Sequence, residues 1–366
     1  VVGNCEVSAL IDSLGRVVWM CLPRPDGDPV FAALLTRELG ENSSGVFSID
    51  LKDCSESSQS YVRNSAIVET SMRSRDGGEI RITDFCPRFN SRGRMFRPRM
   101  LVRIVEPVAG RPQVRLRLRP AVNYGGLATP ECEGSHHLRY AIAGHAYRVT
   151  TDASLTAIAD SREIVIDEPL VFILGPDEPL DESPRALAHR FLAETRTYWQ
   201  EWVRTLAVPF DWQEEVIRAA ITLKLCTYED SGAVLAALTT SIPESPGSGR
   251  TWDYRYCWLR DAYFVVQALN RLGATRTMEG YLHYIDQIVA RTESGFLRPL
   301  YRITGDAPLT ERFILSLDGY LGMGPVRVGN QAKTQTQHDV YGSVILAASQ
   351  LFFDQLSISF NLVLHP

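Results

Sequence analysis

The amino-acid sequence predicts a multidomain protein that is β-rich first and α-rich second: an N-terminal β-sandwich, one linking helix and a helical remainder. Three observations lead to this prediction. Apolar and polar residues alternate through much of residues 1–180, Pro and acidic residues interrupt the pattern at 176–184, and helical spacing runs onward from residue 209. The length of 366 residues suits two or three domains.

The predicted sandwich, residues 1–180, is built from short strands separated by turn residues. "SALIDSLGRVVWMCL" is two apolar runs joined by Ser-Leu-Gly, which predicts a β-hairpin. "AIVETSMRSRDGGEIRITDF" predicts a second hairpin, with Asp-Gly-Gly at the turn. In "QVRLRLRP", Val114, Leu116 and Leu118 alternate with arginines, so one face of this strand belongs in a core and the other in water. Many such strands are typical of a β-sandwich.

Residues 181–208 are predicted to form a linking helix, with Ser183 as its N-cap and Pro184 at the first helical position. From 209 onward the apolar spacing is helical. It predicts four further helices, at about Val216–Leu223, Phe264–Leu272, Met278–Val289 and Tyr341–Leu351. The last stretch, 355–366, instead alternates like a strand and is atypical of what precedes it.

Composition and charge exclude several classes of function. A net charge of -5 argues against nucleic acid or an anionic membrane surface as a partner. No apolar run reaches the roughly 18–20 residues of a membrane span, and the first residues lack the pattern of a signal peptide, so a cytoplasmic location is expected. Seven scattered cysteines without Cys-x-x-Cys spacing indicate reduced thiols and no metal knuckle.

The twelve residues "TWDYRYCWLRDA", 251–262, carry the densest chemistry of the chain. We call them the aromatic–charged motif. They follow a Pro/Gly/Ser loop and precede a predicted helix, a junction at which functional side chains are often held. Aromatic faces stack on sugar rings, and an adjacent Arg260–Asp261 can hold hydroxyls, so the motif fits a carbohydrate subsite. The alternative is a buried salt-bridge cluster that anchors the helix, with the rings in the core.

A second candidate segment is 309–342, a long polar, Gly-rich loop that ends at Asp339 before a helix. Loops of this length without periodicity are usually functional. Arg327 and Asn330 are candidate binding residues, with solvated loop positions as the alternative. Asp339 is either a binding residue or a first-turn acid favoured by the helix dipole.

Three separated segments together resemble glycoside hydrolase family 15, the glucoamylase-like and bacterial trehalase-like enzymes. "TTSIPE…R-TWDYRYCWLRDA" is similar to the family signature, "ALIDSLGRVVWMCLPRPDGDPVFAALL" to the start of the N-terminal sandwich of bacterial members, and "LTERFILSLDGYLGMGPVRVGNQAKTQTQHDVYG" to a later segment. The resemblance covers residues 1 to about 354. Thr251 departs from it, because relatives often carry Asn there.

The resemblance implies that residues 209–366 are the N-terminal part of an (α/α)6 barrel. It implies inverting hydrolysis of α-glucosidic bonds, of maltooligosaccharide or trehalose type, from the non-reducing end. Trp258 would stack on the terminal glucose or lie beside it. Arg260 and Asp261 would bind the distal hydroxyls of this glucose, and Tyr254 would lie near the reacting centre. The expected substrate-binding residues are Trp252, Tyr254, Trp258, Arg260, Asp261, Arg327, Asn330 and Asp339.

An inverting glycosidase needs two carboxyl groups roughly 6.5–9.5 Å apart, one as general acid and one as general base. In this family both are glutamates that follow an Asp-x-Tyr-Gly element, here Asp339–Gly342, so the given sequence is expected to lack both and to turn over no substrate. No catalytic residue is therefore assigned. Twelve barrel helices of about 11–12 residues with loops of about 4–6 need on the order of 200 residues, and the helical stretch is shorter.

The expected partner is a small-molecule α-glucoside, without nucleic acid or membrane and without a metal or organic cofactor, because acid–base hydrolysis needs none. The sequence does not define the oligomeric state. Two other functions stay open. One is a non-catalytic carbohydrate-binding protein, which would use the same aromatic and charged residues. The other is a related phosphorylase, for which the sequence shows no phosphate-binding cluster.

Overall fold

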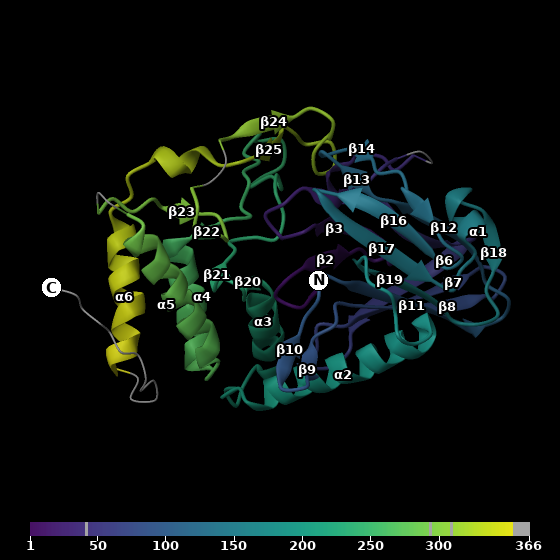
Figure 1. Ribbon diagram of the computed structural model, residues 1–366, viewed down its shortest axis with the longest axis horizontal. Coiled ribbons are helices and arrows are strands. Elements are labelled where there is room, and N and C mark those ends of the chain that lie inside the picture. Colours follow the sequence, from purple (N-terminus) through teal and green to yellow (C-terminus); the bar gives the residue numbers. More distant parts are fainter. Residues whose placement is uncertain (41–42, 293–294, 308–309, 354–366) are drawn as a thin grey trace.

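A computed structural model describes residues 1–40, 43–292, 295–307 and 310–353 (Figure 1). Two β-sheets occupy one side of the molecule, a long helix runs along its lower edge, and a group of helices stands on the other side. The alternating tail predicted for 355–366 lies outside the described residues.

The first part of the chain is a two-layer antiparallel β structure. One sheet contains, in spatial order, β1 (Val2–Gly3), β2 (Ser8–Ile11), β3 (Val17–Cys21), β5 (Val46–Leu51), β12 (Gln113–Arg119) and β18 (Glu163–Val165), with β4 (Pro29–Phe31) on β3. The other contains β15 (Cys132–Glu133), β16 (His137–Ile142), β17 (His145–Thr151), β19 (Leu170–Pro176), β11 (Leu101–Ala109), β8 (Glu79–Phe85), β7 (Val68–Ser74) and β6 (Cys54–Tyr61).

The two sheets share one apolar core. Phe47 of β5 and Phe172 of β19 meet edge to face across it, with ring centroids 5.6 Å apart. On β12 the predicted alternation is observed: Val114, Leu116 and Leu118 are buried while the arginines between them point outward. Smaller elements around the sheets are η1 (Ala33–Leu35), α1 (Leu155–Ala159), and the strand pairs β9 (Phe89–Ser91) with β10 (Arg94–Phe96) and β13 (Ala121–Val122) with β14 (Gly126–Leu127).

The linking helix α2 (Pro184–Arg204) begins as the sequence predicts. The Ser183 hydroxyl accepts a hydrogen bond from the amide of Ala186 at 3.3 Å, and Pro184 opens the helix. Further along, Trp199 is fully buried in a cluster that includes Ala66 before the helix and Ile221 after it. Because this packing crosses both expected boundaries, the division into residues 1–180, 181–208 and 209–366 stays a prediction.

The prediction of a partial (α/α)6 barrel is wrong for the part of the chain that the structure describes. After α2 only α3 (Gln213–Leu225), α4 (Leu259–Arg271), α5 (Thr275–Ala290) and α6 (Asp339–Phe353) are α-helical there. They form a group around α4, which packs against the other three, and not a closed ring (Figure 1). Helical spacing shows which face of each helix is apolar, but it does not show how the helices are arranged.

The remaining residues between these helices form loops and two-stranded ribbons. The ribbons pair β20 (Thr227–Tyr228) with β21 (Ala233–Val234), β22 (Cys257–Trp258) with β23 (Leu300–Tyr301), and β24 (Arg312–Ile314) with β25 (Val326–Val328), which precedes η2 (Gln331–Thr334). Among the described helices, none is long and apolar enough to pass through a bilayer.

Candidate functional site

The aromatic–charged motif is extended up to Trp258 and becomes helix α4 at Leu259. In the extended part, Asp253 and Arg255 are buried, whereas Trp252 and Tyr254 between them are partly exposed. Side chains alternate across an extended backbone, so neighbouring residues face opposite sides. The motif therefore has an inner half directed into the protein and an outer half open to solvent.

The inner half is a buried ion pair. The Asp253 carboxylate accepts hydrogen bonds from Nε and Nη2 of Arg255, both at 2.9 Å, and from the amide of Gly329 at 3.1 Å. Arg255 also donates to the carbonyl of Gly27 and, at 3.1 Å, to the hydroxyl of Tyr124. These contacts join the motif to the β-sheet part of the chain. The alternative of a buried anchoring cluster is thus correct for this half, whose residues the sequence did not single out.

Two aromatic rings lie next to this outer half: Tyr254 is partly exposed, whereas Trp258 is buried, with 7% of its surface exposed. The ring centroids of Tyr254 and Trp258 are 5.5 Å apart, and the Tyr254 hydroxyl donates to Oε1 of Glu244 at 2.8 Å. Burial raises the pKa of Tyr254 to about 12, and the hydrogen bond to Glu244 adds to this. Ala332 of η2 packs against the buried cluster of Tyr256, Trp258 and Leu300. The two rings form a fixed wall beside the start of α4.

Polar groups lie next to this wall, at the first turns of two helices. Arg260 of α4 contacts Asp261 at 3.1 Å and Asp339 of α6 at 3.2 Å. The three side chains are 42%, 48% and 48% exposed. Both carboxylates lie in a helix first turn, where the dipole favours negative charge. The cluster is open to solvent, so its donors and acceptors can reach the hydroxyls of a small molecule.

The other predicted residues have partners within the protein. The Arg327 guanidinium lies 4.6 Å from the ring of Trp252, and its Nη1 contacts Glu311 at 2.6 Å. The Asn330 side chain accepts from the amide of Ala332 and donates to the carbonyl of Asp253. Asn330 is therefore the N-cap of η2.

All eight predicted residues lie in one region, because contacts join the segments that carry them. Arg327 stacks on Trp252, Asn330 donates to the carbonyl of Asp253, and Arg260 donates to Asp339. Glu244 also belongs to this region. Hydrogen bonds from Arg250 and Tyr254 lower the pKa of its carboxyl, which is thus ionised at neutral pH. Sequence reasoning missed this role of Glu244, although the residue stands in the "TTSIPE" segment that leads into the motif.

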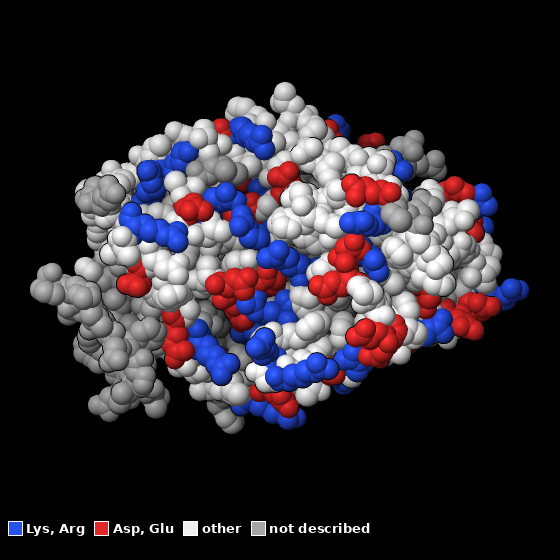
Figure 2. Space-filling view, in the orientation of Figure 1, with Lys and Arg blue, Asp and Glu red and all other residues white. Residues whose placement is uncertain are grey.

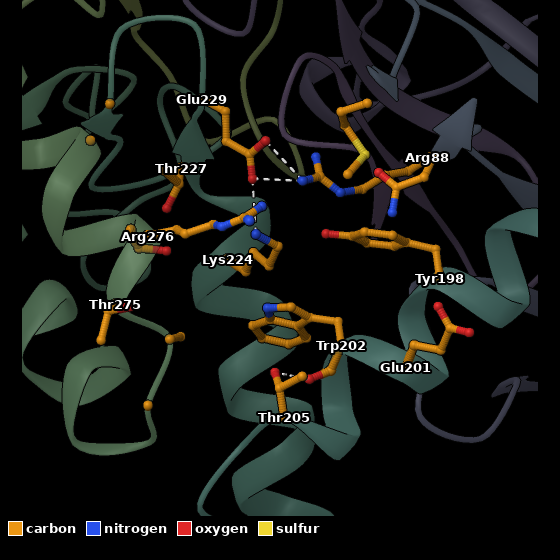
Figure 3. A pocket seen from close by; sticks show the side chains of 17 residues that line it. Arg88, Tyr198, Glu201, Trp202, Thr205, Lys224, Thr227, Glu229, Thr275 and Arg276 are labelled. Carbon is orange, nitrogen blue, oxygen red and sulfur yellow. Dashed lines mark hydrogen bonds and ion pairs between the residues drawn. The ribbon is translucent and has the colours of Figure 1, made fainter. Parts of the chain in front are cut away.

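A separate pocket of about 600 Å³ lies where α2, α3 and the start of α5 meet, and Figure 3 shows its side chains. None of the predicted site residues lines it. Its upper wall is the Glu229 carboxylate, which binds Arg88 and Lys224, both at 2.8 Å. Burial raises the pKa of Glu229, but the charges of Arg88 and Lys224 outweigh this and hold it at about 2.

Charged side chains of both signs are interspersed over the face shown in Figure 2, and they gather around a hollow between the β-rich and helical sides. Among the described residues, no group of three or more His, Cys, Asp or Glu side chains is placed to hold a metal ion. The cysteines whose side chains are described, Cys5, Cys21, Cys54, Cys86, Cys226 and Cys257, are free thiols.

Comparison with known proteins identifies the family. The model of "Glycosyl hydrolases family 15" matches residues 212–363, and that of "Trehalase-like, N-terminal" matches residues 1–141. Residues 212–363 thus belong to glycosyl hydrolase family 15, and residues 1–141 to the trehalase-like N-terminal family. The resemblance inferred from the motif and the two flanking segments is thereby confirmed, and the family-15 match contains the whole aromatic–charged motif.

Several curated family relatives are named trehalases. The chain is 31% identical to the trehalase of Mycolicibacterium smegmatis over 372 residues, which covers 93% of this chain and 55% of that protein. It is 30% identical to the trehalase of Mycobacterium tuberculosis, with 93% and 53% covered, and 29% identical to that of Thermoplasma volcanium, with 94% and 55% covered. The chain thus spans about half the length of these relatives.

Proposed function

We propose that this family-15 protein acts on α-glucosides of the trehalose type and that the outer half of the motif holds the non-reducing-end glucose. The observation that carries the proposal is the open cluster of Arg260, Asp261 and Asp339 beside the Tyr254–Trp258 wall. The trehalase names of the relatives support the choice of substrate class.

Each part of this site has a defined task in the proposal. The partly exposed Tyr254 ring presents apolar surface to the apolar face of the sugar, and the buried Trp258 ring, whose centroid is 5.5 Å away, supports it. Arg260 donates to ring hydroxyls, while Asp261 and Asp339 accept from them with charge-assisted hydrogen bonds. Because Arg260 already lies between the two carboxylates, its guanidinium is oriented before the sugar arrives, which reduces the entropy lost on binding.

The hydrolytic step requires a proton donor whose pKa is raised, placed opposite a carboxylate that activates water. Each carboxyl described around the site instead lies in an ion pair with an arginine. Glu244 pairs with Arg250, Glu311 pairs with Arg327 at 2.6 Å, and the two aspartates pair with Arg260. This observation favours the second candidate function, sugar binding without turnover, for the 366-residue chain taken by itself.

Calorimetric titration with glucose, trehalose and maltose tests the binding proposal, and assay of glucose release tests turnover. We expect the chain to bind these sugars and Arg260→Ala to weaken binding at least tenfold, which is about 1.4 kcal/mol. Arg271→Ala, an exposed arginine at the other end of α4, is the matched control and leaves affinity unchanged. Equal affinity in wild type and Arg260→Ala would remove the assignment of the site.

Rapid release of glucose by the 366-residue chain would show that a described carboxyl acts as acid or base despite its ion pair. Release that persists in Glu244→Gln and Glu311→Gln would exclude both glutamates.

A further inference from the structure

The pocket between α2, α3 and the start of α5, which we call the junction pocket, is built by segments that lie far apart in the sequence. Arg88 comes from the β-rich part, Trp202 from α2, Lys224 from α3 and Thr275 from α5. In Figure 3, Thr275 lies across the pocket from Tyr198. The volume of about 600 Å³ is within the range of about 300–1,000 Å³ that is usual for small-molecule sites. A ligand in this pocket contacts the β-rich part and the helices together.

Two aromatic rings line the pocket, and neighbouring side chains hold both of them. Tyr198 and Trp202 are partly exposed. The fully buried Trp199 supports Trp202, with ring centroids 5.8 Å apart and planes at 89°. The Lys224 ammonium lies 5.2 Å from the Trp202 ring centroid, and the Arg88 guanidinium lies 4.8 Å from that of Tyr198. Because the rings are already ordered, a ligand that packs on them costs little side-chain entropy.

The charges that line the pocket nearly balance. The cations are Arg88, Lys224 and Arg276, and the carboxylates are Glu201 and Glu229. Glu229 binds Arg88 and Lys224, both at 2.8 Å. A free anion would therefore be repelled by Glu229 and would compete with it for the same two cations. Sugar hydroxyls both donate and accept hydrogen bonds, so they satisfy charges of either sign without this cost.

Hydrogen-bonding capacity also remains in the pocket. An ammonium has three N–H donors, and within the described part of the chain that of Lys224 meets one acceptor, Oε1 of Glu229. Glu201 is exposed at the rim, one residue before Trp202. Donors, acceptors and aromatic surface thus face one space, as the polar and apolar sides of a sugar require.

We propose that the junction pocket binds a neutral mono- or disaccharide at a site separate from the terminal-glucose site, and that the bound sugar stabilises the contact between the β-rich part and the helices. The rings of Tyr198 and Trp202 pack on the sugar, Lys224 donates to its hydroxyls, and Glu201 accepts from them. The inference does not depend on the proposed function, because none of the residues predicted for the terminal-glucose site lines this pocket.

Titration calorimetry with glucose, trehalose and maltose tests this site in Arg260→Ala, in which the terminal-glucose site is weakened. We expect one remaining site for at least one of these sugars. Adding Thr275→Phe fills the pocket from the start of α5 and lowers this affinity at least tenfold, and adding Glu201→Ala lowers it about threefold. Arg204→Ala, at an exposed position of α2 outside the pocket lining, is the matched control and leaves the affinity unchanged.

Thermal unfolding tests the stabilisation. A ligand that binds only the folded state raises the unfolding midpoint, and sugars also raise it without binding, because they are excluded from protein surfaces. The rise is therefore expected to be larger in Arg260→Ala than in Arg260→Ala with Thr275→Phe at the same sugar concentration. Far-ultraviolet circular dichroism verifies that Thr275→Phe keeps the fold. Sugar should also change the emission of Trp202, and Trp202→Phe should remove this change.

The outcomes separate this inference from the proposed function. If Arg260→Ala binds no sugar, or binds it equally well with Thr275→Phe, the junction site is wrong. If phosphate or sulfate binds there and sugars do not, the pocket takes anions and the inference is overturned. If Thr275→Phe alone removes all sugar binding while Arg260→Ala removes none, the junction site stands and the terminal-glucose site falls.

Discussion

Replacing Asp253 by asparagine tests whether the inner half of the aromatic–charged motif stabilises the fold. The carboxylate is completely buried and accepts four hydrogen bonds, three from Arg255 and one from Gly329. The asparagine side chain would have the same shape but no charge. Arg255, with 1% of its surface exposed, would then carry an uncompensated charge in the interior.

The expected cost is large because both partners are removed from water. Breaking a buried ion pair by neutralising one member costs about 3–5 kcal/mol. The outer pair provides the contrast: Arg260 and Asp261 are 42% and 48% exposed, and exposed pairs contribute about 0–1 kcal/mol. Arg260→Ala is therefore the control, because the two substitutions lie in the same twelve residues and differ mainly in burial.

Urea unfolding, followed by tryptophan fluorescence and far-ultraviolet circular dichroism, measures the difference. With a slope of about 3 kcal/mol/M, Asp253→Asn lowers the midpoint by about 1 M or more, and Arg260→Ala lowers it by less than about 0.3 M. Sugar affinity follows the opposite order. The reasoning fails if the two variants unfold at the same urea concentration, since burial would then not decide the energy of the pair.

Three further predictions concern other residues. The charges of Arg88 and Lys224 hold the pKa of Glu229 at about 2, against 4.5 for the free side chain. The ionised carboxyl therefore contributes about 3 kcal/mol to the free energy of unfolding above pH 4.5, and this contribution is lost as the pH falls toward 2. Thermal unfolding between these pH values should be steeply acid-dependent in wild type and less so in Glu229→Gln. Tyr254 should ionise near pH 12, and Glu244→Gln should lower that value, as measured by absorbance at 295 nm against Tyr254→Phe. Gly232→Ala should lower the free energy of unfolding, measured by chemical denaturation, by about 2–4 kcal/mol, because φ is +84° and an added Cβ would lie 1.9 Å from a carbonyl oxygen of α5. The control Gly247→Ala, with φ +70° and nothing near the added Cβ, should lower it by only about 1 kcal/mol.

Local signals in the sequence located most elements but not their assembly. The alternation at Val114, Leu116 and Leu118 gave the correct buried face of β12, and Ser183 with Pro184 gave the start of α2. These features depend on neighbouring residues alone. The helical arrangement after α2 depends on which faces meet, and single-sequence spacing does not contain that information, so the expected partial barrel was wrong.

The sequence predicted where the candidate site lies but not what each of its residues does. All eight residues expected to bind sugar do lie together, yet Asn330 caps η2 and Arg327 is enclosed by two rings. An asparagine that caps a helix and one that binds a ligand look the same in the sequence. Only the hydrogen-bond partners of the side chain in the folded protein distinguish the two roles. Whether any of the eight residues contacts sugar stays a prediction.

The two interpretations of the aromatic–charged motif were posed as alternatives, but the backbone makes them complementary. An extended segment directs successive side chains to opposite sides, so Asp253 and Arg255 enter the interior while Trp252 and Tyr254 face outward. The inner pair fixes the segment to the β-sheet part through Gly27 and Tyr124, and this fixation positions the outer rings. Composition alone counts the two Arg–Asp pairs as equivalent. The buried pair, Asp253–Arg255, stabilises the fold, whereas the exposed pair, Arg260–Asp261, is available to a ligand. Substitutions in the two halves therefore separate effects on folding from effects on binding.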